Sequence, residues 1–241
     1  HRDFVHAGSD VVEAFTYFAH REKLRQLGKE ELLEQMNRQA LRIAKEVAQE
    51  TNTLLAGNIC NTNAFIEGDA DSPKIVRAMF DEQLEWAIDA GVEFVIAETL
   101  DFSGEAMIAL EAIKKTNLPA VITLAIHREG VTREGFSPVD TCKQLEDAGA
   151  DVVGLNCALG PNTMLPLLRP ICEAVTCPVG ALPVPYRTKH TEPTFQSLRD
   201  TACNCIPEDR PFPVALDPFT CNRYEIQEFT RAARDLGVTY F

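Results

Sequence analysis

The chain has 241 residues, of which 45% are hydrophobic, and 36 acidic against 23 basic residues give a formal net charge of -13 at pH 7. This charge disfavours nucleic acid and anionic membranes as partners, since both prefer a basic protein surface. No apolar run approaches the roughly 18 residues of a membrane span, and the opening residues HRDFVHAGSD have no signal-peptide core. We expect a cytoplasmic protein that folds as a single domain over residues 1–241.

The eight cysteines are too sparse and too scattered for a disulfide scaffold. None of their spacings gives the paired C-x2-C knuckles of a structural zinc site. We expect reduced thiols and no zinc finger.

Short apolar runs alternate with longer amphipathic segments along the chain. The strand candidates are 10–18, 53–60, 92–98, 119–126, 151–157, 178–184 and 238–241. Helical spacing of apolar residues predicts a helix over 30–50, and Ser137-Pro138 followed by Asp140 predicts a capped helix start. Trp86 lies inside a helix predicted over 73–90, where packing is its expected role. The stretch 186–212 is irregular, and we assign 213–217 to a loop.

Four similar junctions recur, each with a glycine after a helix and before a strand: HAGSDVV, DAGVEFV, DAGADVV and DLGVTYF. Their glycines, at 8, 91, 149 and 237, are expected to take left-handed backbone angles. The junctions precede every second predicted strand, and the spacing between their glycines fits the dimensions of a (β/α)8 TIM barrel. A doubly wound open sheet is the alternative. Seven strands are present, so we expect the first barrel strand to precede His1 and the last to continue beyond Phe241.

In such barrels the chemistry lies at the carboxyl ends of the strands. Taken alone, Cys157 is a buried core thiol or a ligand, and Glu98 is salt-bridged or binds a substrate. Tyr17 and Phe18 pack or receive a cation on their rings. The amides at these ends belong to turns or bind a substrate. Further candidates at the strand ends are Thr16, Asn58, Cys60, His127 and Asn156. For Cys60 we expect core packing, and for His127 a role in orienting its loop.

Six strings in order, VGLNC, EFVIAET, LLAGNICNTN, ALDPF, NRYEIQEF and DLGVTYF, resemble the homocysteine S-methyltransferase family, nearest its betaine–homocysteine branch. The resemblance implies a zinc-dependent enzyme in which Cys157 is one metal ligand. It places two further, adjacent cysteine ligands a few residues beyond Phe241. Zinc bound by three thiolates keeps a position for the substrate thiol.

The resemblance also implies transfer of a methyl group from a small, betaine-like onium donor to L-homocysteine, which gives methionine. Glu98 would receive the ammonium of homocysteine, and the substrate site would include Thr16, Tyr17, Phe18, Asn58 and Asn156. Betaine-using relatives have a tyrosine where Phe18 stands, so S-methylmethionine or dimethylsulfoniopropionate is the alternative donor. A metal-free barrel that only binds a small amino acid, or a binding module of a larger assembly, is the alternative of another class. A homo-oligomer is compatible with all of these.

Overall fold

The computed structural model describes residues 1–199 and 216–241, along which strands and helices alternate. The strands are β1 (Val11–Glu13), β2 (Leu54–Cys60), β3 (Phe94–Leu100), β4 (Ala120–Leu124), β5 (Val152–Asn156), β6 (Val179–Leu182) and β7 (Val238–Tyr240). The α-helices are α1 (Arg2–His6), α2 (Arg21–Gln26), α3 (Leu33–Thr51), α4 (Ser72–Ala90), α5 (Ser103–Lys114), α6 (Pro138–Asp147), α7 (Pro161–Ala174) and α8 (Arg223–Asp235). Single 3-10 turns cover Glu30–Leu32, Phe195–Ser197 and Asp217–Phe219.

The strand order in the sheet follows the chain order from β1 to β7. The pairs β1–β2, β2–β3, β5–β6 and β6–β7 are parallel. In a doubly wound sheet, the order of the strands reverses at a switch point. A sheet whose parallel strands follow the chain order and are joined by helices is the pattern of a barrel. The predicted α/β fold of the TIM-barrel type is therefore confirmed.

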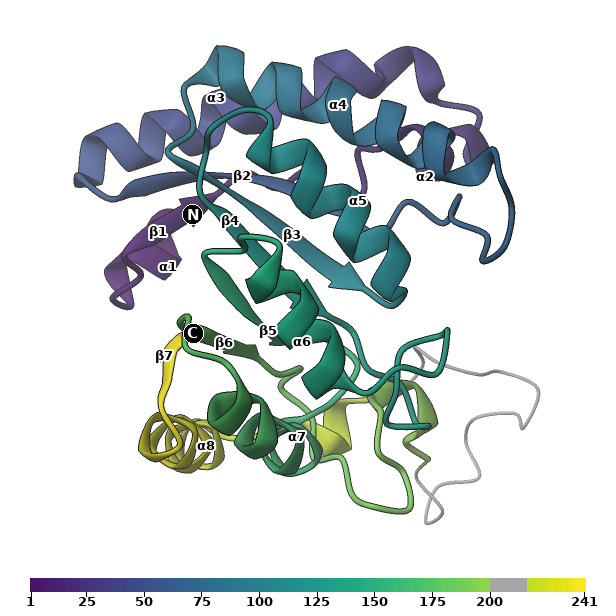
Figure 1. The fold of residues 1–241 in the computed structure, drawn as a ribbon. Coiled ribbons are helices and arrows are strands. Elements are labelled where there is room, and N and C mark those ends of the chain that lie inside the picture. Colours follow the sequence, from purple (N-terminus) through teal and green to yellow (C-terminus); the bar gives the residue numbers. More distant parts are fainter. Residues whose placement is uncertain (200–215) are drawn as a thin grey trace. The chain divides into compact units, whose positions relative to one another are not determined.

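The residues form two compact units, which we describe separately: residues 1–122 with 148–151, and residues 123–147 with 152–241. In the first unit, α3, α4 and α5 lie along one face of β2 and β3 (Figure 1). A methyl group added at Gly57 would lie 3.2 Å from Cβ of Ala87 in α4, so Gly57 faces the helices. Side chains alternate along a strand, so Asn58 faces away from the helix layer.

The second unit contains β5, β6 and β7 with α6, α7 and α8 (Figure 1). Gly154 and Gly180 are register partners in β5 and β6. A side chain at Gly154 would run into the Gly180 backbone, so this strand pair needs glycine for its close approach.

The predicted helix ends and starts agree with the structure. The junction glycines 8, 91, 149 and 237 all have positive φ, between 77° and 110°. The predicted cap before α6 is present, since Ser137 Oγ accepts a hydrogen bond from Asp140 N at 3.0 Å. Trp86 is buried in α4, as expected for a packing residue.

One predicted strand is wrong in its length. The run 10–18 forms a strand only as far as Glu13, because the chain then curls into a turn in which Thr16 N donates to Ala14 O and Ala19 N donates to Thr16 O, both at 2.8 Å. Part of the predicted loop, 213–215, lies outside the described residues. Its last residue, Asp217, begins a 3-10 turn.

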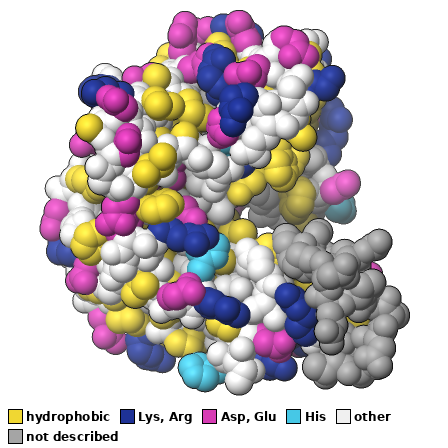
Figure 2. Space-filling model, turned by 90° about the vertical axis from the view of Figure 1, so that its right-hand side faces the viewer, with side chains coloured by type: hydrophobic (Ala, Val, Ile, Leu, Met, Phe, Trp, Pro, Cys, Tyr) yellow, Lys and Arg dark blue, Asp and Glu magenta, His cyan; other side chains and the backbone are white. Residues whose placement is uncertain are grey.

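The surface carries charges of both signs. On the face shown in Figure 2, acidic side chains are interspersed with Lys and Arg, and apolar side chains lie between them. Within residues 1–199 and 216–241, no helix combines the length and the apolar character that crossing a membrane requires.

Candidate functional site

Three non-glycine residues at strand ends have left-handed backbone angles. Thr99, near the end of β3, has φ 59°, and Cys157 and Ala158, directly after β5, have φ 56° and 51°. Such angles cost roughly 1 to 3 kcal/mol each and concentrate at functional sites, because the surrounding structure must hold them. The strain therefore marks the two strand ends that carry Glu98 and Cys157.

In the first unit, one amide bridges two carboxyl groups. Asn58 Nδ2 donates to Glu13 Oε1 at 2.6 Å and to Glu98 Oε1 at 2.8 Å. Thr16 Oγ1 donates to the backbone oxygen of Asn58 at 2.9 Å, and Thr99 Oγ1 donates to Glu98 Oε2 at 3.3 Å. The structure thus joins three sequence-predicted residues, Thr16, Asn58 and Glu98, in one hydrogen-bonded cluster.

The pKa values of both carboxyl groups in the cluster are raised. Burial, followed by the nearby charge of Glu98, raises the pKa of Glu13 to about 8. Burial also raises the pKa of Glu98, against the lowering effects of its hydrogen bonds to Asn58 and Thr99 and of the Lys23 charge. Two neighbouring carboxyls of this kind share a proton near neutral pH.

The aromatic pair follows β1 in the turn. The rings of Tyr17 and Phe18 meet edge to face, with centroids 5.0 Å apart, and Phe18 is 61% exposed. Lys23 Nζ lies 3.6 Å from the Tyr17 ring centroid and 5.5 Å from that of Phe18. The two residues lie in a turn and not in a strand, so their side chains do not alternate between two faces of a sheet. The Tyr17 ring already carries a cation of the protein itself.

Lys23 is also held by hydrogen bonds. Its Nζ donates to Tyr17 O at 2.9 Å and to Cys60 Sγ at 3.4 Å. Cys60 is buried, as core packing predicts, and burial raises the pKa of its thiol to about 12. The Cys60 thiol therefore stays protonated and is a poor nucleophile.

In the second unit, Asn156 ends β5 and Cys157 follows it. Asn156 is buried and pairs in register with Leu182, whose backbone oxygen accepts a hydrogen bond from Cys157 N at 3.0 Å. The Cys157 side chain keeps partial access to solvent. In the part of the chain that the structure describes, no three His, Cys, Asp or Glu side chains gather as a metal site. Cys157 is thus a single thiol at a strained strand end.

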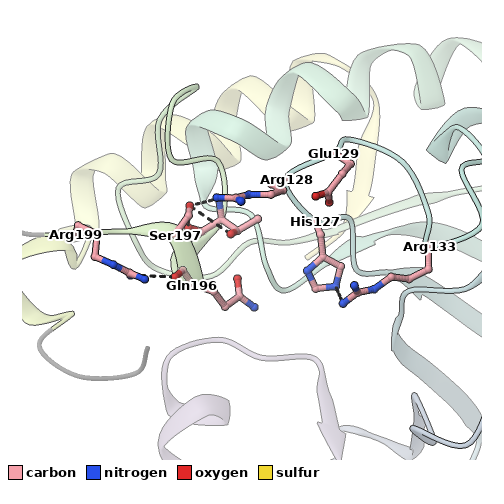
Figure 3. A pocket seen from close by; sticks show the side chains of 8 residues that line it. His127, Arg128, Glu129, Arg133, Gln196, Ser197 and Arg199 are labelled. Atoms are coloured by element: carbon pink, nitrogen blue, oxygen red, sulfur yellow. Dashed lines mark hydrogen bonds between the residues drawn. The ribbon is translucent and has the colours of Figure 1, made fainter. Parts of the chain in front are cut away.

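A cavity of about 630 Å³ lies in the same unit. Its walls are the loop after β4 and the segment around the second 3-10 turn, with the lining residues His127, Arg128, Glu129, Arg133, Thr194, Gln196, Ser197 and Arg199. Figure 3 shows Arg128 extending toward Ser197 on the facing segment and Arg133 reaching toward His127. Arg133 Nη2 lies 3.4 Å from His127 Nε2. This contact supports the expectation that His127 organises its loop.

The cavity wall is attached to the Cys157 strand end. Phe195 N donates to Ala158 O at 2.9 Å, and Leu159 and Thr194 form an isolated antiparallel bridge. The residue that follows Cys157 therefore positions the segment that carries Gln196 and Ser197.

Glu13, Lys23 and the arginine-lined cavity of the second unit, here called the arginine cavity, were not predicted from the sequence. Glu13 interrupts the apolar run DVVEAFTYF in the same way that Glu98 interrupts its own, and this signal could have identified it. Lys23 and Arg128 have no such signal, because exposed helices and loops commonly carry basic residues.

The chain is similar in sequence to proteins of one known family. The family model for homocysteine S-methyltransferase matches residues 1–206. The whole chain aligns at 34% identity with betaine–homocysteine S-methyltransferase 1 of Xenopus laevis, and at 30% with S-methylmethionine–homocysteine S-methyltransferase of Pongo abelii. It spans 59% and 62% of these relatives.

A solved structure agrees in fold. The metallated homocysteine methyltransferase MmuM from Escherichia coli aligns with a TM-score of 0.63 at 17% identity, over 74% of this chain and 68% of that one. The family model covers most of the chain, and the sequence likeness to the curated relatives extends over all of it. The chain belongs to the homocysteine S-methyltransferase family.

Proposed function

We propose that the protein transfers a methyl group from a small onium donor to the thiol of L-homocysteine and so forms methionine. The sulfur of homocysteine, as a thiolate, attacks the methyl carbon in line with the bond to the donor's nitrogen or sulfur. The new carbon–sulfur bond forms as the old bond breaks, and its electron pair leaves with the neutral amine or thioether. Such a reaction depends on positioning more than on acid–base catalysis.

The observation that carries this proposal is the half-buried carboxyl of Glu98. It lies in β3 with Asn58 and Thr99 as hydrogen-bond donors, and on the face of the sheet away from the helices. A buried carboxylate needs a cationic partner or hydrogen bonds. We assign it to the ammonium group of homocysteine, with Asn58 and Thr16 fixing its position.

We assign Cys157 as a thiolate ligand of zinc. A half-buried thiol at a strained strand end fits one position of a thiolate set. Within residues 1–199 and 216–241 there is no set of three such ligands, so Cys157 is the one metal ligand that we assign in this part of the chain. Zinc, when bound by thiolates, would hold the substrate sulfur as a thiolate at neutral pH.

The donor is proposed to be betaine-like, with its cation against Phe18. Phe18 is 61% exposed and offers an apolar ring without a hydroxyl group. Lys23 Nζ lies closer to the ring centroid of Tyr17, at 3.6 Å, than to that of Phe18, at 5.5 Å, so Phe18 is the more accessible of the two rings for an incoming cation. The missing hydroxyl favours S-methylmethionine or dimethylsulfoniopropionate as the second candidate donor.

The second unit has a carboxylate-binding candidate of its own. The arginine cavity carries Arg128, Arg133 and Arg199 against one acid, Glu129. Guanidinium groups bind carboxylates through paired hydrogen bonds. We propose that this cavity binds a carboxylate-bearing ligand.

A donor comparison tests this function. The protein is supplied with homocysteine and with betaine, S-methylmethionine or dimethylsulfoniopropionate in turn, and methionine is measured. We expect methionine from at least one donor. Failure with all three, together with retained homocysteine binding, would favour a protein that only binds the amino acid.

A further inference from the structure

Two buried amides of the helix layer converge on one backbone carbonyl, that of Ala19. Asn37 Nδ2, in α3, donates to Ala19 O at 2.7 Å, and Gln83 Nε2, in α4, donates to the same oxygen at 3.3 Å. Gln83 Nε2 also donates to Asn37 Oδ1 at 3.3 Å, which ties the two amides to each other. Ala19 therefore links the chain after β1 to two helices.

Packing alone does not explain these amides. Asn37 is 2% exposed and Gln83 is 4% exposed, and burying an amide is unfavourable unless its hydrogen bonds are made. Among the described residues, Gln83 Oε1 has no hydrogen-bond partner, so this side chain carries a cost that an apolar side chain of the same size would not. What the two amides provide in return is the pair of bonds to Ala19 O.

Ala19 directly follows the aromatic pair. In the turn after β1, Ala19 N donates to Thr16 O at 2.8 Å, and Thr16 Oγ1 donates to Asn58 O in β2 at 2.9 Å. Tyr17 and Phe18 therefore lie between one anchor on the sheet and one anchor on the helices of the same unit.

The Phe18 ring depends on these anchors for its position. Phe18 is 61% exposed, and its ring meets those of Phe15 and Tyr17 edge to face, with centroids 6.4 Å and 5.0 Å away. Phe15 is itself 71% exposed, so little core packing holds this group of rings. A ring that the core does not hold is oriented by the backbone that carries it.

We propose that Asn37 and Gln83 are positioning residues that orient Phe18 for the cation of the methyl donor and so determine the affinity for quaternary ammonium or sulfonium compounds. This inference rests on the proposed function, in which the donor cation lies against Phe18. The attraction requires the cation over the face of the ring, and it is lost when the ring turns. A ring that is oriented before the donor arrives also loses less conformational freedom on binding.

Steady-state kinetics of the whole protein test this role, with homocysteine and with betaine, S-methylmethionine or dimethylsulfoniopropionate as donor. Asn37→Leu removes the shorter bond to Ala19 O. We expect it to raise KM for the donor about tenfold, and to change kcat and KM for homocysteine by less than about twofold. Gln83→Met removes the longer bond from a side chain of similar size and should raise KM for the donor about threefold. Amide hydrogen exchange at Ala19 should be faster in both variants.

A double-substitution cycle with Phe18→Leu separates positioning from a general loss of stability. Phe18→Leu should itself raise KM for the donor, and Asn37→Leu should then add less than about twofold, because no ring remains to be oriented. Ser72→Ala is the matched control. Ser72 is another buried polar side chain of α4, but it bonds to the backbone of Ile66 and not to the turn. Its variant should leave KM for the donor unchanged.

Circular dichroism checks that the variants fold, and if Asn37→Leu does not, the cycle with Gln83→Met decides. An unchanged KM for the donor in the amide variants, or an effect of the same size with and without Phe18, would overturn this inference and leave the proposed function standing. If Phe18→Leu leaves KM for every donor unchanged, or if the unaltered protein forms no methionine from any of the three, the proposed function itself fails, and this inference with it.

Discussion

Replacing Glu13 by glutamine should change how the stability of the protein depends on pH. The pKa of this carboxyl is about 8 in the folded chain, against an ordinary value of 4.5. A raised pKa means that the folded state binds the proton more tightly than the unfolded state. The stabilising contribution is therefore complete below pH 4.5 and is lost as pH rises toward 8.

The size of the effect follows from the shift. At about 1.4 kcal/mol per pKa unit, the separation between 4.5 and about 8 sets an upper limit of about 5 kcal/mol. Glu13 keeps some contact with solvent, which screens its charge, so we expect about half of this limit. The free energy of unfolding of Glu13→Gln, relative to the unaltered chain, should rise by about 2 kcal/mol between pH 5 and pH 9.

Urea unfolding at a series of pH values measures this difference directly. Glu67→Gln, at an exposed carboxyl, reports what the loss of one surface charge does on its own. A difference between Glu13→Gln and the unaltered chain that stays flat with pH, or that falls as pH rises, would refute the shared-proton description of the pair.

Three further substitutions test the assigned roles. Cys157→Ala should lose zinc, measured by elemental analysis of the whole protein, and should lower methionine formation by more than about 100-fold. Its control Cys172→Ala, at another half-buried thiol, should retain both zinc and activity. Zinc retained in Cys157→Ala would contradict the ligand assignment. Glu98→Gln should raise KM for homocysteine by about 10- to 100-fold and leave zinc in place, and an unchanged KM would remove Glu98 from the site. Arg128→Gln should weaken the binding of a carboxylate to the arginine cavity several-fold, measured by titration calorimetry. Arg231→Gln, on an exposed part of α8, is its control, and an equal effect of both would show a general charge effect.

Periodicity and glycine placement predicted most of the fold, because both report on the backbone. Gly91 and Gly149 have positive φ where a helix ends before a strand. Glycine at these positions of the sequence indicates such a turn. The length of β1 was not predictable from them. Apolar and aromatic residues continue through Phe18, but the backbone turns at Ala14–Thr16 through local hydrogen bonds that no periodicity encodes.

The candidate site was predicted where a polar residue interrupts an apolar strand. Glu98, Asn58 and Cys157 all stand at such interruptions. The position of Lys23 over Tyr17 depends on the turn that follows β1, and the arginine cavity depends on how the loop after β4 meets residues some 65 positions later. Contacts between segments so far apart follow from tertiary packing, which the sequence pattern does not specify.

The fate of a labelled methyl group tests the central claim most directly. The whole protein is incubated with homocysteine and a donor whose methyl groups are fully deuterated, and the methionine formed is analysed by mass spectrometry. Direct transfer predicts methionine that carries an intact deuterated methyl group, at a rate that Glu98→Gln lowers at limiting homocysteine. Methionine without the label, or no methionine from betaine, S-methylmethionine or dimethylsulfoniopropionate, would contradict it.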